Sequence, residues 1–436
     1  MAMDTIKKTY LEELLRGQGT VPASPLSWLN QVRASALERA NALTVPTTRD
    51  EEWRFTDLSP LYKTLLQSAL QPAEVDAAAI EPFVIPEAGS RLVFVDGIFV
   101  EALSILRSED GITVASLASS LAQHSERMQA QLGQMVDFSD DAFSAMNTAR
   151  LRDGALVLLG KDREVSHPIH LLFIGASAGA VSFPRTLVAA SAGSRCTVIE
   201  DFVSLHADSG FTNGVTEIAV GENANVRHIR LQRESANAFH IATSAAKVAR
   251  SGRYSSVSIS LGARLSRLNL NVMQAGEGTE FEIDGLALIA GRQLADTHSF
   301  VDHAFPHGRS RQLHKCIAGG ASHAVFNGKI LVRPGAQRTD SSQQNRSLLL
   351  TPRAHIDTKP QLEIFADDVK CAHGATVGQL DPEQVFYLKA RGLSEATARN
   401  LLTFAFATEI VGRIRVPSLV QRLEDLVVRQ TQSKES

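Results

Sequence analysis

Two potential metal ligands, Cys371 and His373, lie together in the segment "KCAHGATVGQL" near the end of the chain. With one residue between them in extended backbone, both side chains are expected to point to the same face. Two ligands are too few for a closed zinc or iron–sulfur site, which generally takes four. Two interpretations stay open: a buried cysteine beside a structural histidine, or half a site that another chain or a transient ligand completes.

A second group of potential ligands occupies "THSFVDHAFPHGRSRQLHKC", and its members are His298, His303, His307, His314 and Cys316. In an extended strand four residues span roughly 13 Å, so His303 and His307 can share a metal only if the chain turns between them. Pro306 and Gly308 permit such a turn, but the carboxylates that usually orient ligating histidines are sparse here. We therefore expect solvated or core histidines rather than a metal site.

Two further patterns resemble catalytic or nucleotide-binding motifs. The pentapeptide "GASAG", residues 175–179, matches the serine-hydrolase pattern G-x-S-x-G, which needs a strand before the serine and a helix after it. Strand-like residues, "AVSFPRTLVAA", follow it, so we expect a small-residue turn. "LGKDREVS" and "NGKILVRPG" lack the glycine spacing of a phosphate-binding loop. We do not expect the chain to bind ATP by the usual loop.

Composition limits the class of protein. The 436 residues, 47.1 kDa, are 44% hydrophobic and 21% charged, which is typical of a globular chain with two or three domains. A net charge of −3 gives no reason to expect nucleic acid or an anionic membrane as partner. No apolar run approaches the ~20 residues that cross a bilayer, and residues 1–20 have no signal-peptide core. Three cysteines far apart suit a reducing compartment, so we expect a cytoplasmic protein.

Residues 1–152 are expected to form an α-rich region with a small β insert. The segment "SPLSWLNQVRASALERANAL" places apolar residues along one helical stripe, and "VASLASSLAQHSERMQAQL" also has helical character. Between them, "RLVFVDGIFV" has two apolar runs around Asp96-Gly97, which predicts a hairpin.

Residues 153–378 are expected to be β-structured. Short runs of β-branched and aliphatic residues are interrupted by small or polar residues every ten to twenty positions. That pattern fits a solenoid, a sandwich or a propeller. We favour a β-helix because corners such as "GAQRTDSSQQNRS" are rich in amides and hydroxyls that can hydrogen-bond between stacked rungs.

Residues 379–436 are expected to form a helical domain. Asp381 and Pro382 are typical of an N-cap and a first helical position, and Gly392 can take the left-handed position that ends the helix. A second helix should begin near Ser394 and a third after Pro417. The second is expected to bury six apolar residues: Leu401, Leu402, Phe404, Phe406, Ile410 and Val411. An apolar stripe on so small a unit could dock on a partner.

Three segments of the chain resemble the SufB/SufD family of iron–sulfur cluster assembly proteins. The longest runs from Phe326 to Leu393 and contains "FNGKILVRPGAQRTDSSQQNRS" and "DDVKCAHGATVGQLDPEQVFYLKARGL". The others are "EEWRFTDLSP" and "FSAMNTARLRDGALVLL". The resemblance extends over nearly the whole chain. The form "DDVKCAHGATVG" resembles the SufD branch, because the SufB branch usually carries "EHEAT" at this place and has a longer N-terminal half.

This resemblance implies a fold and a role. The fold would be mainly β: a right-handed parallel β-helix core between an N-terminal helical region and a C-terminal helical domain. The chain would be a non-enzymatic scaffold subunit that pairs with SufB through the ends of their β-helices, while its C-terminal helices receive the ATPase SufC. His373 would be the histidine contributed at the seam where a nascent iron–sulfur cluster forms, and Cys371 the adjoining family cysteine.

The resemblance also implies that no cofactor is bound stably by the chain alone and that any cluster is shared with SufB. An isolated chain could pair with a second copy of itself through the same edge. Two rival functions stay open: a β-helix carbohydrate-active enzyme and a stand-alone interaction module. The sequence shows no tight cluster of acidic calcium ligands and basic catalytic residues that the enzyme would need.

Overall fold

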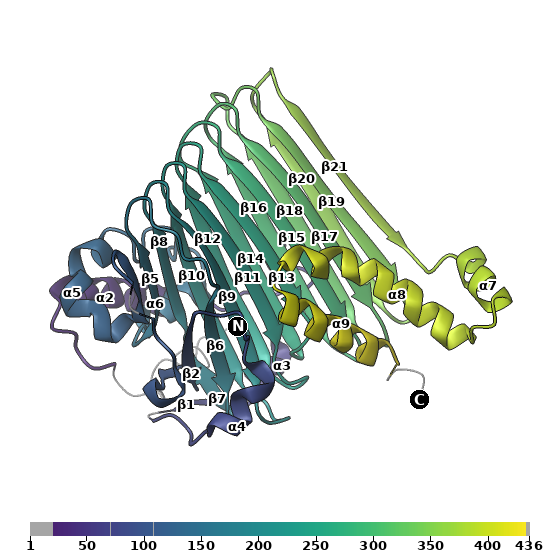
Figure 1. Ribbon diagram of the computed structural model, residues 1–436, viewed down its shortest axis with the longest axis horizontal. Helices are drawn as coiled ribbons and strands as arrows, with labels where there is room; N and C mark the ends of the chain where they lie inside the picture. The colour runs from purple at the N-terminus through teal and green to yellow at the C-terminus, as the bar shows by residue number, and fades with distance from the viewer. Residues whose placement is uncertain (1–20, 70, 108, 433–436) are drawn as a thin grey trace.

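The computed structural model describes residues 21–69, 71–107 and 109–432, and its centre is a parallel β-solenoid of about eight turns. From β8 (Arg185–Ala190) onward, successive strands alternate between two sheets, so each turn of the chain adds one strand to each sheet (Figure 1). Helices precede the solenoid in the chain and follow it. The expected β-helix with helical ends is confirmed.

The two sheets contain all of the described strands. The eleven-stranded sheet comprises β1 (Gln67–Ser68), β4 (Ile112–Ser116), β5 (Gly154–Leu159), β7 (Ala180–Ser182), β8 (Arg185–Ala190), β10 (Phe211–Val220), β12 (Phe239–Val248), β14 (Leu265–Gln274), β16 (Leu294–His303), β18 (His323–Val332) and β20 (His355–Ile364). The ten-stranded sheet comprises β2 (Ser90–Val95), β3 (Ile98–Phe99), β6 (Ile169–Gly175), β9 (Arg195–Ser204), β11 (Asn225–Arg233), β13 (Arg253–Ser260), β15 (Glu280–Ile289), β17 (Arg309–Ala318), β19 (Asp340–Leu349) and β21 (Lys370–Gly378).

One corner of the solenoid repeats the same backbone conformation from turn to turn. Asn223, Ser251, His307 and Arg338 all have φ between 52° and 60°, and Gly278 has φ 68°. Their backbone N–H groups donate to the following turn, for example Ser251 to the Glu277 carbonyl at 2.8 Å and His307 to the Gln337 carbonyl at 2.9 Å. Hydrogen bonds between rungs are present as expected, but at this corner the backbone supplies the donors.

The first turns are covered by the N-terminal part of the chain. Helices α2 (Ser27–Ala42), α5 (Leu117–Gln129) and α6 (Ala142–Ala149) pack there, and the shorter helices are α3 (Ser59–Tyr62), α4 (Ala77–Ile80), η1 (Glu51–Trp53), η2 (Glu81–Phe83) and η3 (Glu101–Leu103). The predicted hairpin is confirmed as the β2–β3 pair, whose turn residues Asp96 and Gly97 have φ 49° and 82°.

The C-terminal helices are α7 (Pro382–Ala390), α8 (Glu395–Val411), η4 (Gly412–Ile414) and α9 (Pro417–Gln432). The predicted caps are confirmed: the Asp381 carboxylate accepts from the Glu383 N–H at 2.9 Å, and the Ser394 hydroxyl from the Thr397 N–H at 3.1 Å. Gly392 has φ 91°. None of the helices with described residues is long and apolar enough to cross a membrane.

Helices α8 and α9 lie on the outer face of the ten-stranded sheet. Ile410, Val411, Leu419 and Leu423 are buried in one cluster with apolar residues of the sheet, including Ile229. One expectation for α8 was wrong, because Leu401 is 47% exposed. Leu401 belongs to the apolar stripe of α8. However, the start of α8 extends toward α7 (Figure 1), and there the Leu401 side chain lines a groove instead of packing on the sheet. The division at residues 152 and 378 stays a prediction.

Candidate functional site

Strand β21 forms the last edge of the ten-stranded sheet and carries both residues of the predicted site. It pairs with β19 on one side and, among the described residues, with no strand on the other. Cys371 lies opposite Ser341, and His373 lies opposite Gln343. Both partners are buried on the inner face of β19, so Cys371 and His373 share the inward-facing side of the solenoid. His373 is exposed and Cys371 half-buried because no later turn covers them.

The polar interior of the solenoid reaches this open end. Below His373, Gln343 Nε2 donates to the side-chain Oε1 of Gln312 at 2.8 Å, and Gln312 Nε2 donates to the Ser299 hydroxyl at 2.8 Å. The Gln343 Oε1 atom is buried and has no hydrogen-bond partner among the described residues. An unsatisfied amide oxygen therefore lies directly beneath the strand that carries the imidazole.

A second polar column lies under Cys371. A hydrogen bond of 2.6 Å joins the hydroxyls of Ser341 and Ser310, and one of 2.9 Å joins Ser310 to His303 Nε2. Burial raises the pKa of the Cys371 thiol above its ordinary value, and the nearby Asp340 carboxylate adds to that. The thiol therefore keeps its proton at neutral pH unless a metal displaces it.

Three members of the histidine-rich segment are core residues. Burial lowers the pKa of His303 to about 4 and that of His314 to about 3, so both are neutral at pH 7. The His314 ring stacks on Phe326 with centroids 4.7 Å apart. Burial raises the pKa of Cys316 to about 12. These groups fill the interior and do not form a site.

The other two members lie elsewhere. His307 occupies the left-handed corner described above. His298 lies on the outer face of β16, 3.1 Å from both an Asp296 oxygen and a Glu52 oxygen, and these carboxylates raise its pKa although burial opposes them. Within residues 21–69, 71–107 and 109–432, no group of three or more His, Cys, Asp or Glu residues is arranged to hold a metal ion.

The sequence "GASAG" forms a turn between strands, as predicted. β6 ends at Gly175 and β7 begins at Ala180, so a strand follows the serine. The Ser177 hydroxyl donates to the Asp96 carboxylate at 2.6 Å, and Gly179 has φ 72°. This serine ties the turn to the hairpin and has no histidine partner.

Sequence reasoning missed a charged network inside the middle turns. The Glu200 carboxylate accepts from the Thr186 hydroxyl at 2.6 Å and lies 2.9 Å from His228 Nε2. Burial alone would raise the pKa of Glu200, but these hydrogen bonds and the positive charges of His228 and Arg230 lower it. The only signal in the sequence is the alternation in "NVRHIRLQR", which fits an exposed polar face equally well. The network satisfies itself and stabilises the interior.

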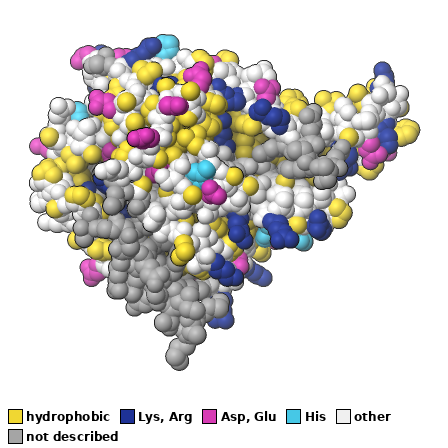
Figure 2. Space-filling model, turned by 90° about the horizontal axis from the view of Figure 1, so that it is seen from below, with side chains coloured by type: hydrophobic (Ala, Val, Ile, Leu, Met, Phe, Trp, Pro, Cys, Tyr) yellow, Lys and Arg dark blue, Asp and Glu magenta, His cyan; other side chains and the backbone are white. Residues whose placement is uncertain are grey.

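A groove between α7 and α8 was only partly foreseen as an apolar stripe. It has a volume of about 990 Å³, and its lining includes Phe386, Tyr387, Leu388, Leu401 and Leu402. Phe386 is 73% exposed and Tyr387 57% exposed. Helix α7 has no buried residue and projects from the body of the molecule (Figure 1). Figure 2 shows hydrophobic side chains at the tip of this projection, next to charged ones.

Two family models match the chain along almost its full length. The SufBD protein N-terminal region matches residues 4–171, and the SufBD core domain of the SUF system for FeS cluster assembly matches residues 173–406. The second match contains both Cys371 and His373.

Full-length relatives agree with these matches. A SufBD family protein of Synechocystis is 42% identical over 96% of this chain and 95% of its own length. The SufD protein of Escherichia coli is 33% identical over 87% of this chain and 88% of its own length, and the chloroplastic protein ABCI7 of Arabidopsis thaliana is 33% identical over 90% and 85%. The chain therefore belongs to the SufB/SufD family of iron–sulfur cluster assembly proteins.

Proposed function

We propose that this chain is a non-catalytic subunit of the Suf assembly scaffold, in which it pairs with SufB, receives the ATPase SufC and contributes His373 at the seam with SufB. One observation carries the proposal. The last turn of the solenoid is open, and on its inner face it carries an exposed imidazole beside a half-buried thiol. The similarity to a protein named SufD supports the same assignment.

The open end has the chemistry of a pairing edge. Strands β20 and β21 end their sheets, so their outer N–H and C=O groups meet no strand among the described residues. Such edges readily pair with another chain. Phe365, which directly follows β20, is 61% exposed, and Val377 on β21 is 45% exposed. SufB would cover both edges, and in its absence a second copy of this chain could do so.

Pairing would convert the half-site into an enclosed one. Imidazole is a common ligand for iron, whereas the protonated Cys371 thiol is a poor ligand until it loses its proton. His373 would be the main donor from this chain, and softer thiolate ligands would come from SufB. The nascent cluster is the cargo of this seam rather than a cofactor that the chain holds alone.

SufC would dock in the groove between α7 and α8. Helix α7 follows β21 directly and projects beyond the open end (Figure 1), so SufC would bind next to SufB. Removing residues 394–436 is a poor test, because α8 and α9 cover apolar residues of the ten-stranded sheet. Single substitutions in the groove separate docking from folding.

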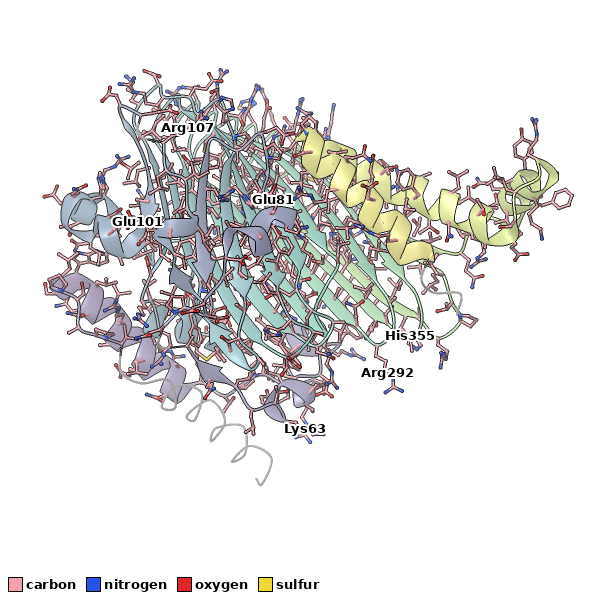
Figure 3. The ribbon with its side chains drawn as sticks, turned by 60° about the horizontal axis from the view of Figure 1, so that its bottom comes forward. Lys63, Glu81, Glu101, Arg107, Arg292 and His355 are labelled. Carbon is pink, nitrogen blue, oxygen red and sulfur yellow. The ribbon has the colours of Figure 1, made fainter. Side chains whose placement is uncertain are left out.

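The proposal is tested by replacing His373 with Ala in the chain co-expressed with SufB and SufC. The complex is purified anaerobically, and the cluster is measured by visible absorption. We expect normal complex recovery with loss of most of the cluster absorption. The matched control is His355→Ala, because His355 is an exposed histidine of β20, near the same end of the solenoid (Figure 3). Equal cluster content in the two variants would refute the role of His373.

A further inference from the structure

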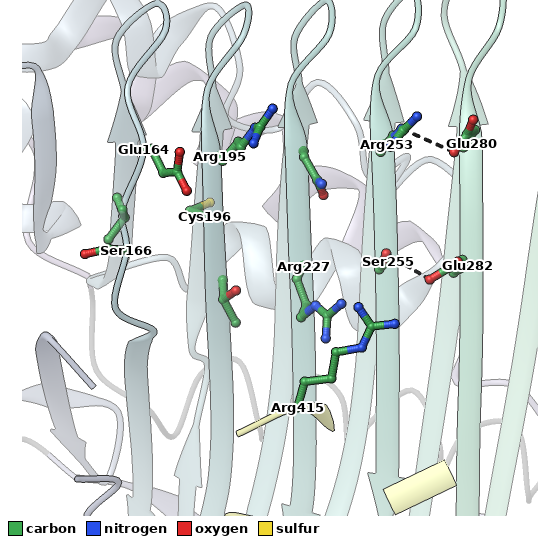
Figure 4. A pocket seen from close by; sticks show the side chains of 13 residues that line it. Glu164, Ser166, Arg195, Cys196, Arg227, Arg253, Ser255, Glu280, Glu282 and Arg415 are labelled. Atoms are coloured by element: carbon green, nitrogen blue, oxygen red, sulfur yellow. Dashed lines mark hydrogen bonds and ion pairs between the residues drawn. The ribbon is translucent and has the colours of Figure 1, made fainter. Parts of the chain in front are cut away.

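A hollow of about 370 Å³ lies on the outer face of the ten-stranded sheet, beside the turn that leads into α9. Four arginines and three glutamates line it, and none of them belongs to the open end or to the α7–α8 groove. Arg227 projects from β11, and Arg415 reaches it from the turn (Figure 4). Arg253 and Glu280, which also line it, form an ion pair of 3.2 Å.

Arg195, Arg227 and Arg415 are the three arginines of this hollow that have no ion pair among the described residues, and Arg227 and Arg415 lie next to each other (Figure 4). Arg227 Nη1 donates to the Arg413 carbonyl oxygen at 3.3 Å, which holds it against the turn. Burial lowers the pKa of Arg227 and repulsion from Arg415 lowers it further, while the Glu282 carboxylate opposes both. Figure 4 shows both groups facing the same space.

Arg413, a neighbouring arginine, has the carboxylate partner that Arg227 and Arg415 lack among the described residues. Arg413 lies two residues before Arg415 and donates to the Asp284 carboxylate at 2.6 Å. The carboxylate that acts on Arg227 is that of Glu282, which also accepts a long hydrogen bond of 3.5 Å from the Ser255 hydroxyl. Two like charges held together at a partly buried position repel each other unless an anion lies between them. Two guanidinium forks suit a phosphate, which offers several oxygens for paired hydrogen bonds.

We propose that Arg227 and Arg415 form a binding site for a phosphate group, either of free phosphate or of a nucleotide. The hollow is larger than one phosphate ion, so it leaves room for the rest of a nucleotide. The site lies where the C-terminal helices meet the solenoid, and it is separate from the seam assigned to His373.

The test is isothermal titration of the full chain with sodium phosphate, and separately with ADP, at constant ionic strength set by chloride. Arg415→Gly is the first variant, because Arg415 has φ 57° and glycine adopts this conformation without strain. Arg227→Gln is the second variant. Each should weaken phosphate binding about tenfold or more, the usual effect of losing one charge-assisted contact. Arg309→Gln is the matched control, since Arg309 is an exposed arginine of the same sheet outside the hollow.

Glu282→Gln gives a change in the opposite direction. It removes a negative charge that faces Arg227, so phosphate should bind more tightly to this variant than to the natural chain. Tighter binding of ADP than of phosphate, lost in the same two variants, would identify a nucleotide as the source, and equal binding would identify the free ion. No saturable binding of either anion overturns the proposal. Binding that Arg415→Gly and Arg227→Gln leave at the level of Arg309→Gln also overturns it.

Discussion

The two ends of the solenoid differ in how their edge strands are covered. At its beginning, β4 runs antiparallel to β5 and β3 antiparallel to β2, and helices of the same chain pack over the first turns. At its end, β20 and β21 have no further strand beside them among the described residues, and most of β21 is exposed. The same architecture is therefore closed by its own chain at one end and left open at the other. The closed end provides stability, and the open end is available for assembly.

Buried polar side chains near the two ends also differ in their hydrogen bonding. Near the beginning, the buried Arg185 guanidinium is bonded to the Glu217 carboxylate, to Asn147 and to Thr148. At the open end, Gln343 Oε1 has no partner among the described residues, and His373 is exposed above it. Buried atoms without a partner also occur in the early turns, for example Asn213 Oδ1, but Gln343 lies under the edge strand β21, where a second chain could complete its hydrogen bonds.

The largest effect is expected at the closed end. Arg185→Ala leaves the buried Glu217 carboxylate without its cation, and breaking a buried ion pair in this way costs about 3–5 kcal/mol. The free energy of unfolding, measured by chemical denaturation, should fall by that amount. Arg292→Ala is the control, because Arg292 is an exposed arginine (Figure 3), and it should change stability by less than about 0.5 kcal/mol. Similar losses in both variants would show that the closed end does not depend on this pair.

The next effect is a pH dependence of the interior. The pKa of His314 is lowered to about 3 in the folded chain, whereas an unfolded histidine titrates near 6.5. Below pH 6.5 the unfolded state binds a proton at this histidine that the folded state does not bind. The free energy of unfolding therefore falls as the pH falls from 6.5 toward 3. At pH 5 this costs roughly 2 kcal/mol.

His314→Gln should remove about that part of the difference in unfolding free energy between pH 7.5 and pH 5. His303→Gln is a parallel variant, since the pKa of His303 is lowered to about 4 and the expected change has the same sign. Chemical denaturation at the two pH values measures both. An unchanged pH difference in the two variants would mean that these histidines do not limit acid stability.

A smaller effect is expected at the projecting helix. Phe386→Ala removes the most exposed ring of the α7–α8 groove and should weaken SufC binding about tenfold, near the threshold for an interface hot spot. Folding should be unaffected because α7 has no buried residue. Surface plasmon resonance with SufC measures the affinity. Leu65→Ala is the control, since Leu65 is 95% exposed outside the groove, and equal affinities in the two variants would place the SufC contact elsewhere.

Local structure was predictable wherever one residue type fixes the backbone. Asp381 and Ser394 marked the starts of α7 and α8, and Asp96-Gly97 marked the hairpin. The solenoid was harder to separate from a sandwich or a propeller, because all three alternate short strands with small-residue corners. The distinction depends on which strands pair, and here each strand of the later turns pairs with the second strand before and after it.

Burial was less predictable than secondary structure. Leu401 belongs to the apolar stripe of α8 and is nevertheless exposed, because the stripe does not reveal where the neighbouring sheet ends. Glu200 and His228 occupy strand positions that fit a solvated face, but they lie inside the solenoid, where they bond to each other. In the same way, the shared face of Cys371 and His373 was predictable from their spacing, whereas their position at an open end was expected only from the family resemblance.

The most direct measurement of the central claim compares the two ends by photo-crosslinking. A photoreactive phenylalanine analogue replaces Val377 on β21 in one variant and Ile105 near β2 in another; both side chains are exposed, at 45% and 54%. After irradiation of the complex with SufB and SufC, mass spectrometry identifies the cross-linked peptides. We predict SufB peptides attached at position 377 and none at position 105. SufB attached at position 105 but absent from position 377 would contradict the assignment of the open end as the seam.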